Sequence, residues 1–269
     1  NGLLSVGLNI GDNTFKSNTL LSRVTEDRVR VADGVEGDEG LNSVRSTMEY
    51  VERQFLSQQF TGQHLLGDSD RVTIDWQGTA SQATRDAPDR RDVRFDLPNP
   101  NGIYQLEVGA LVRRYDDLTD NNYDASTDLE YLLGSTSNLE HSIAFGVQAI
   151  YRDRDSDSAS YGFDANPITV SRDAPNLKVS DVINTGTITG DRETGYTFNE
   201  KTLPSDSYEA DMELNSFYST YDVLWKSNYQ FIIGARYEDF NQTTKTFSID
   251  DISTKQKSNL DEDTILPSL

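Results

Sequence analysis

The sequence predicts an all-β protein: an antiparallel, up-and-down transmembrane β-barrel, of which this chain forms a part. Several segments alternate apolar and polar residues, which indicates strands with one apolar face. Pairs of these segments are joined by short polar turns, and successive pairs are separated by long polar stretches. Compact soluble domains rarely hold several long structureless loops, whereas a transmembrane barrel has short turns at one rim and long loops at the other. A soluble β-sandwich or jelly roll with ordinary insertions is the alternative.

The clearest hairpin spans residues 216–238. In its first arm Phe217 and Tyr221 fall on one face, while the other face is mostly polar. The second arm begins at Tyr229 and alternates in the same way, after a turn at 226–228. A short polar connection between two alternating arms is typical of a tight β-hairpin. The broad apolar face of both arms suits contact with lipid.

Further alternating segments predict the remaining strands, roughly eight in all, which is part of a larger barrel. They lie at residues 4–10, 14–24, 48–66, 72–80, 129–133 and 143–151. We assign the short turns between them to a periplasmic rim. The long polar stretches become extracellular loops, approximately at residues 25–44, 84–121, 153–213 and 240–264. All 269 residues then belong to one barrel domain.

The composition excludes several classes of function. A net charge of -21 repels nucleic-acid phosphates, so we expect no nucleic-acid partner. The chain has no cysteine, which rules out disulfides, thiolate metal sites and cysteine nucleophiles. It has no run of about 18 consecutive apolar residues, so no transmembrane helix is expected. A transmembrane strand needs only about ten residues with alternate ones apolar, which the low mean hydropathy does not contradict.

Several short segments follow one another along the chain in an order that matches a known family: residues 50–64, Ile74-Asp-Trp76, 83–91, Phe145-Gly146, 233–238 and 266–269. In this order the chain resembles the TonB-dependent outer-membrane receptors of Gram-negative bacteria. The resemblance implies a barrel of about 22 strands around an N-terminal plug. It also implies active uptake of a scarce nutrient such as a siderophore, cobalamin or glycan, powered by the TonB complex through an N-terminal box. This sequence shows no plug, no such box and no closing strand with a terminal aromatic residue, so we expect a mid-barrel piece.

A charged cluster is the candidate ligand-binding site at the base of an extracellular loop. It comprises Arg85, Asp86, Asp89, Arg90 and Arg91. Guanidinium groups bind carboxylates and phosphates in a fork geometry, so the arginines could hold an anionic group of a ligand. The alternative is that these residues pair among themselves and brace the loop.

An acidic segment is the candidate calcium site. It places carboxylates at Asp153, Asp155, Asp157 and Asp164, which is the spacing of an EF-hand loop. Ser158 stands where that loop requires glycine, and no flanking helices are predicted. A solvated loop is the alternative. No other cofactor is expected, although clustered carboxylates predict that divalent cations stabilise the protein.

Aromatic residues near the predicted strand ends form a candidate membrane girdle: Trp76, Tyr131, Tyr151, Tyr221, Trp225, Tyr229 and Tyr237. Ordinary packing in a soluble sheet is the alternative. The two histidines, His64 and His141, are expected at the periplasmic rim. No catalytic or nucleotide-binding motif occurs, so we expect no enzymatic activity.

The expected function is therefore active nutrient uptake at the cell outer membrane, as a segment of a TonB-dependent receptor. The expected partners are outer-membrane lipid and lipopolysaccharide, the TonB complex and a small-molecule or oligomeric nutrient. A secreted or surface β-domain for adhesion or glycan binding is the alternative from another class. A passive porin is a third.

Overall fold

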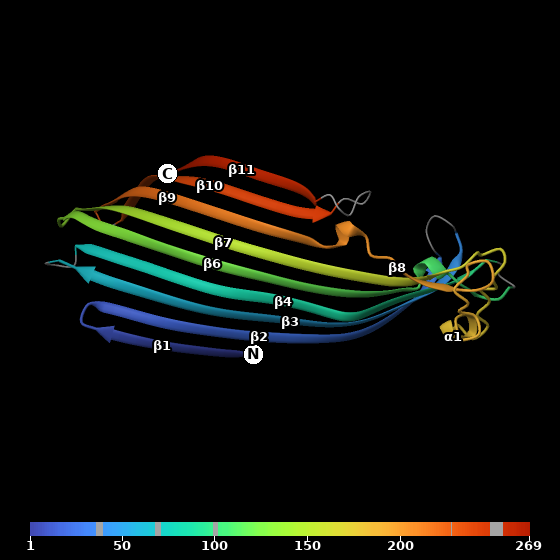
Figure 1. Cartoon of the computed structure of the whole chain (residues 1–269). Helices are drawn as coiled ribbons and strands as arrows, with labels where there is room; N and C mark the ends of the chain where they lie inside the picture. The colour runs from blue at the N-terminus through green and yellow to red at the C-terminus, as the bar shows by residue number, and fades with distance from the viewer. Residues whose placement is uncertain (36–39, 68–70, 99–101, 227, 248–254) are drawn as a thin grey trace.

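The computed structural model describes residues 1–35, 40–67, 71–98, 102–226, 228–247 and 255–269. Almost all regular structure is β, in a single antiparallel sheet of 11 strands (Figure 1). The main strands follow one another in the order β1-β2-β3-β4-β6-β7-β9-β10-β11, each paired with its neighbour along the chain. Their bounds are β1 Gly2–Ile10, β2 Asn13–Val35, β3 Asn42–Leu66, β4 Val72–Leu97, β6 Val112–Ser135, β7 Leu139–Asp164, β9 Tyr208–Trp225, β10 Tyr229–Phe247 and β11 Lys255–Ser268.

This up-and-down order confirms the predicted fold class. The sheet is open: β1 and β11 are its two edges, and no pairing joins them among the described residues. Two short strands lie off the main path, with β5 (Gln105–Leu106) paired to β4 and β8 (Thr197–Glu200) paired to β7. The arrangement is that of a partial β-barrel. No helix within the described part of the chain is long and apolar enough to cross a membrane.

The connections differ between the two ends of the sheet. Four short turns, between β1 and β2, β3 and β4, β6 and β7, and β9 and β10, lie at one end, which we call the turn end (Figure 1). The other end, the loop end, carries the longer connections, including residues 165–207 between β7 and β9. The predicted asymmetry of short turns and long connections is therefore present.

The strands run much further toward the loop end than the sequence pattern predicted. β4 and β7 each have 26 residues, and strand pairing continues through most of the ranges 25–44, 84–121 and 240–264 that were expected to be loops. In the range 153–213 it covers only the two ends and the short β8, so residues 165–196 and 201–207 remain a connection, as expected. Most of strand β11 lies within the expected loop 240–264. The alternation signal is lost there because polar residues occupy both faces. The backbone ladder does not need that alternation, and it continues wherever a neighbouring strand offers partners.

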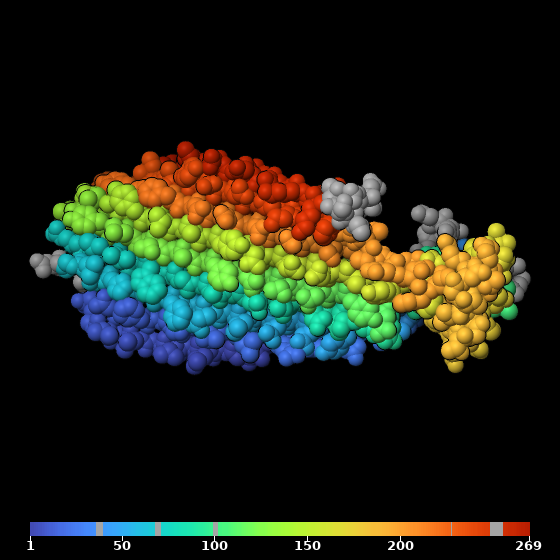
Figure 2. All heavy atoms as spheres, in the orientation of Figure 1, coloured from blue at the N-terminus to red at the C-terminus, as the bar shows by residue number. Residues whose placement is uncertain are grey.

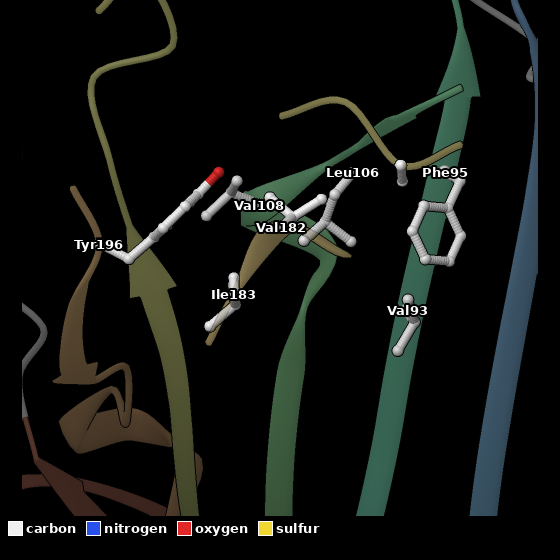
Figure 3. Close-up of a cluster of buried hydrophobic side chains, with 8 residues drawn as sticks. Val93, Phe95, Leu106, Val108, Val182, Ile183 and Tyr196 are labelled. Atoms are coloured by element: carbon white, nitrogen blue, oxygen red, sulfur yellow. The ribbon is translucent and has the colours of Figure 1, made fainter. Parts of the chain in front are cut away.

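A small apolar core closes the loop end. Its eight buried residues are Val93, Phe95, Leu106, Val108, Ala174, Val182, Ile183 and Tyr196 (Figure 3). They come from β4, β5, the 3-10 turn Val108–Ala110, helix α1 (Val179–Val182) and the connection between β7 and β9. The space-filling view shows this unit as a compact knob beyond the strands (Figure 2). Among the residues that the structure describes, most of the buried apolar side chains thus lie in this knob and few lie elsewhere in the sheet.

Candidate functional site

The two faces of the sheet differ in chemistry, as the strand register shows. One row of directly opposed residues crosses eight strands and is mostly apolar: Leu8, Phe15, Gly62, Trp76, Thr127, Val147, Phe217 and Tyr237. The adjacent row points to the opposite face and is mostly polar: Thr14, Gln63, Asp75, Asp128, Gly146, Tyr218 and Arg236. We call these surfaces the apolar face and the polar face.

The apolar face is open over the half of the sheet nearest the turn end. Large side chains such as Val6, Phe60, Val147, Phe231 and Ile233 are between 51% and 63% exposed. On β9 the apolar stretch extends from Phe217 to Trp225, close to the nine to eleven residues with which a tilted strand crosses a bilayer. Soluble proteins rarely expose a continuous apolar surface of this extent.

All seven residues of the predicted girdle lie on the apolar face: Trp76, Tyr131, Tyr151, Tyr221, Trp225, Tyr229 and Tyr237. Aromatic rings gather at the two limits of the apolar stretch. At the turn end Trp225 and Tyr229 lie with ring centroids 5.8 Å apart, and at the other limit Tyr123 stacks on Tyr151 with centroids 6.3 Å apart. The sequence prediction did not include Tyr123.

The polar face carries a hydrogen-bonded network between strands. The Tyr218 hydroxyl donates to Asp128 Oδ1 over 2.5 Å. Arg236 Nη2 donates to Gln148 Oε1 at 3.0 Å, and the Gln148 amide donates in turn to Asp124 Oδ2 at 2.8 Å. These bonds reach over several strands and hold polar side chains side by side, as the lining of a hydrated interior would require.

A glycine makes room for this network. Gly146 lies between Asp128 and Tyr218 in the register, on the strand that separates them. A Cβ atom at position 146 would overlap the Tyr218 ring and lie 2.5 Å from Asp128 Oδ1. The absence of a side chain at Gly146 therefore lets Tyr218 cross β7 and reach Asp128.

The five charged residues of the predicted ligand site lie on β4, beyond the apolar stretch. Arg85 approaches Glu49 at 3.6 Å and Asp116 at 3.9 Å, and so connects β3 to β6 on the polar face. Arg90 pairs with Asp92 at 3.0 Å on its own strand. The arginines of this segment therefore pair mostly with carboxylates outside the predicted cluster.

A β-bulge separates the members of the cluster. The β4–β6 register shifts between Ala87 and Arg90, so Arg90 lies on the same polar face as Arg85, and Arg91, its neighbour in the strand, lies on the other. Asp89 accepts bonds from both Arg91, at 2.5 Å, and Arg113, at 2.7 Å. The hydrogen bond from Arg91 holds the pKa of the Asp89 carboxyl below its ordinary value, with Arg113 adding to the effect. Asp86, which was expected at the base of a loop, lies within β4 between Arg85 and the bulge, opposite Glu52 on β3 and Asp117 on β6.

The four carboxylates of the predicted calcium site lie along β7 instead of around a loop. In an extended strand alternate residues share a face, so Asp153, Asp155 and Asp157 point one way and Asp164 the other. Asp153 accepts a bond from Asn121 at 2.9 Å, while Asp164 accepts one from Lys201 at 2.5 Å. No group of three or more potential metal ligands converges within the described ranges. The EF-hand geometry expected from the spacing is not formed, because strand pairing keeps the segment extended.

The two predicted rim histidines lie on different strands and each has an aromatic partner. His64 accepts a hydrogen bond from Trp76, and His141 Nδ1 lies 3.1 Å from the Tyr221 hydroxyl. Both are near the turn end, as predicted.

Comparison with known proteins gives little information on the function of this chain. No family model matches the sequence, and no curated protein matches it. Among solved structures, the siderophore receptor PiuA from Acinetobacter baumannii aligns with 96% of this chain at 11% identity and a TM-score of 0.48. The chain spans 40% of the length of that receptor. Similarity at this level does not assign a function.

Proposed function

We propose that this chain is a segment of an outer-membrane β-barrel that takes up a scarce nutrient, in the manner of a TonB-dependent receptor. The observation that carries the proposal is the two-faced sheet, with an exposed apolar stretch bounded by aromatic rings on one face and a polar network on the other. In a transmembrane barrel the first face meets lipid and the second faces the interior.

The orientation follows from the two ends of the sheet. Short turns belong at the periplasmic rim and longer connections outside the cell. The loop end, with its knob and its long strand extensions, then projects beyond the membrane and is placed to capture a ligand. The sequence resemblance supports active uptake, with the TonB complex as the energy source and lipopolysaccharide as the surrounding outer lipid.

The alternative of a secreted adhesion or glycan-binding domain requires the apolar face to be covered within a soluble fold. No second layer packs against that face among the described residues, and its large side chains are exposed. A passive porin would share the same two faces. The sequence resemblance favours the receptor over the porin.

A topology experiment tests the proposal. The 269 residues contain no cysteine, so each introduced cysteine is the only one within them. Thr185→Cys lies in the knob at the loop end, and Asp12→Cys lies in the turn between β1 and β2; both positions are exposed. In the full-length protein expressed in a Gram-negative cell, a membrane-impermeant maleimide should label position 185 in intact cells and position 12 only after the outer membrane is opened.

Fractionation provides a second measurement of the same proposal. The protein should appear in the outer-membrane fraction and migrate differently on a gel before and after heating, as folded barrels do. Recovery in the aqueous fraction, or equal labelling of the two cysteines in intact cells, would contradict it.

A further inference from the structure

Arginines oppose one another across the strands at the loop end of the polar face. Arg45 on β3 is directly opposite Arg94 on β4, and Arg90 on β4 is directly opposite Arg114 on β6. Like charges in directly opposed positions destabilise a sheet unless something compensates them. Their concentration is unusual in a chain with a net charge of -21.

These arginines line two adjoining hollows. One, of about 440 Å³, is bounded by Arg30, Arg45 and Arg90, with Asp33 and Asp92. The other, of about 600 Å³, is bounded by Arg45, Arg90, Arg94 and Arg114, with Asp92 and Glu107. Because Arg45, Arg90 and Asp92 belong to both, the two hollows form one continuous surface. Its lining holds five arginines and three carboxylates, and two of these arginines, Arg94 and Arg114, are paired with Asp96 and Asp116 just outside the lining.

The ion pairs of these residues leave some guanidinium groups available. Arg90 pairs with Asp92 at 3.0 Å, Arg94 with Asp96 at 3.1 Å and Arg114 with Asp116 at 2.7 Å. Within the described part of the chain, Arg30 and Arg45 have no ion pair, and both are exposed. Each guanidinium presents a fork of donors that matches a carboxylate or a phosphate group. Two unpaired guanidinium groups beside three paired ones favour an anion with more than one such group.

We propose that this surface, which we call the arginine hollow, binds a small ligand that carries at least two carboxylate or phosphate groups. This inference rests on the proposed function, because it names the chemical class of nutrient that the loop end captures. It differs from the site expected from the sequence, since of that cluster only Arg90 takes part. Arg30 and Arg45 bind the ligand directly, while Arg90, Arg94 and Arg114, each paired with a carboxylate, form the wall around them.

Binding of two simple probes tests the inference. Citrate and inorganic pyrophosphate are titrated into the purified full chain, folded in detergent micelles, and the heat of binding is measured at low and at raised salt. The variant carrying Arg30→Gln and Arg45→Gln should bind the preferred probe at least about tenfold more weakly, since each loses charge-assisted hydrogen bonds. The preference between the probes separates carboxylate from phosphate ligands.

Arg23→Gln is the matched control, because it removes an arginine from the same strand as Arg30 but outside the hollow, where Arg23 pairs with Glu52. It should bind as the parent does. Equal affinity in the double variant and the parent, or no binding of either probe by correctly folded protein, would overturn the inference. If the protein fails the topology experiment but binds a probe through Arg30 and Arg45, the proposed function fails and the arginine hollow stands.

Discussion

Trp76 donates its indole N–H to Nε2 of His64 over 2.9 Å, and Nδ1 of the same imidazole lies 2.7 Å from Oδ1 of Asn13. An indole nitrogen can only donate, so Nε2 must accept, and the ring proton resides on Nδ1 and is donated to Asn13. The three residues come from β4, β3 and β2, and they tie these strands together on the apolar face.

Gly62→Ala should disrupt this contact. Gly62 is directly opposite Trp76, and a Cβ atom at position 62 would overlap the indole ring. The ring must then move and lose its bond to His64, which we expect to cost about 1–3 kcal/mol in unfolding free energy. Urea unfolding in lipid vesicles measures the change. Gly78→Ala is the control, because a Cβ there meets nothing within 4 Å; equal losses in the two variants would contradict the role of Gly62.

Tyr218→Phe should weaken the polar face without changing its packing. The substitution removes only the hydroxyl that donates to Asp128, a hydrogen bond to a charged group whose loss costs about 1.5–3 kcal/mol. Gly146→Ala should produce a loss at least as large, because a methyl group at that position displaces the same ring. The double variant should be little worse than Gly146→Ala alone. Additive losses in the double variant would show that Gly146 and Tyr218 act separately.

Ile233→Lys should impair membrane insertion, whereas Ile232→Lys should leave it nearly unchanged. The two isoleucines are adjacent on β10, but Ile233 lies on the apolar face and is opposite Tyr221, while Ile232 is opposite Asp222. A lysine that faces lipid near the middle of the bilayer costs about 2–4 kcal/mol, whereas one on the interior face is tolerated. Folding yield in vesicles, followed by heat-modifiable migration, compares them. Similar yields for the two variants would argue against a lipid-facing role for Ile233.

The contact between Lys201 and Asp164 should make the stability of residues 197–203, between β7 and β9, depend on pH. The hydrogen bond from Lys201 holds the pKa of Asp164 below its ordinary value of 3.8. A carboxyl whose pKa is lowered in the folded state contributes stability above its unfolded value, and that stability is lost as the pH falls through the folded value. Amide exchange in residues 197–203 should therefore be slower in the parent than in Asp164→Asn at pH 6.

At a pH well below 3.8 the same two proteins should exchange alike. Glu200→Gln serves as the control, because within the described chain Glu200 makes no ion pair and lies on the neighbouring strand β8. A difference between parent and Asp164→Asn that persisted unchanged at low pH would contradict the assignment.

The half of the sheet nearest the turn end could be predicted from the amino-acid sequence. Alternation in segments such as 143–151 and 229–238 specified strands, their faces and their short connections. The seven girdle residues were placed on one face for the same reason, since alternate residues of a strand share a face. The loop-end half carried no such signal, because water on both sides permits polar residues at every position.

Chemistry that depends on neighbouring strands was not predictable from one strand at a time. The spacing of Asp153, Asp155, Asp157 and Asp164 matches a calcium loop only if the chain curls, and pairing of β7 with β6 and β9 keeps it straight. The contact of Arg85 with Glu49 likewise depends on a register that a one-residue shift would abolish.

The amino-acid order of this protein thus specified an antiparallel sheet with one apolar and one polar face, because side-chain alternation is a local property of an extended chain. Tertiary pairing settled how far each strand runs, where the bulge at 87–90 places Arg90 and not Arg91 on the polar face, and which arginines meet in the arginine hollow. These features arise from contacts between residues distant in sequence, and their register is fixed only when the strands are assembled.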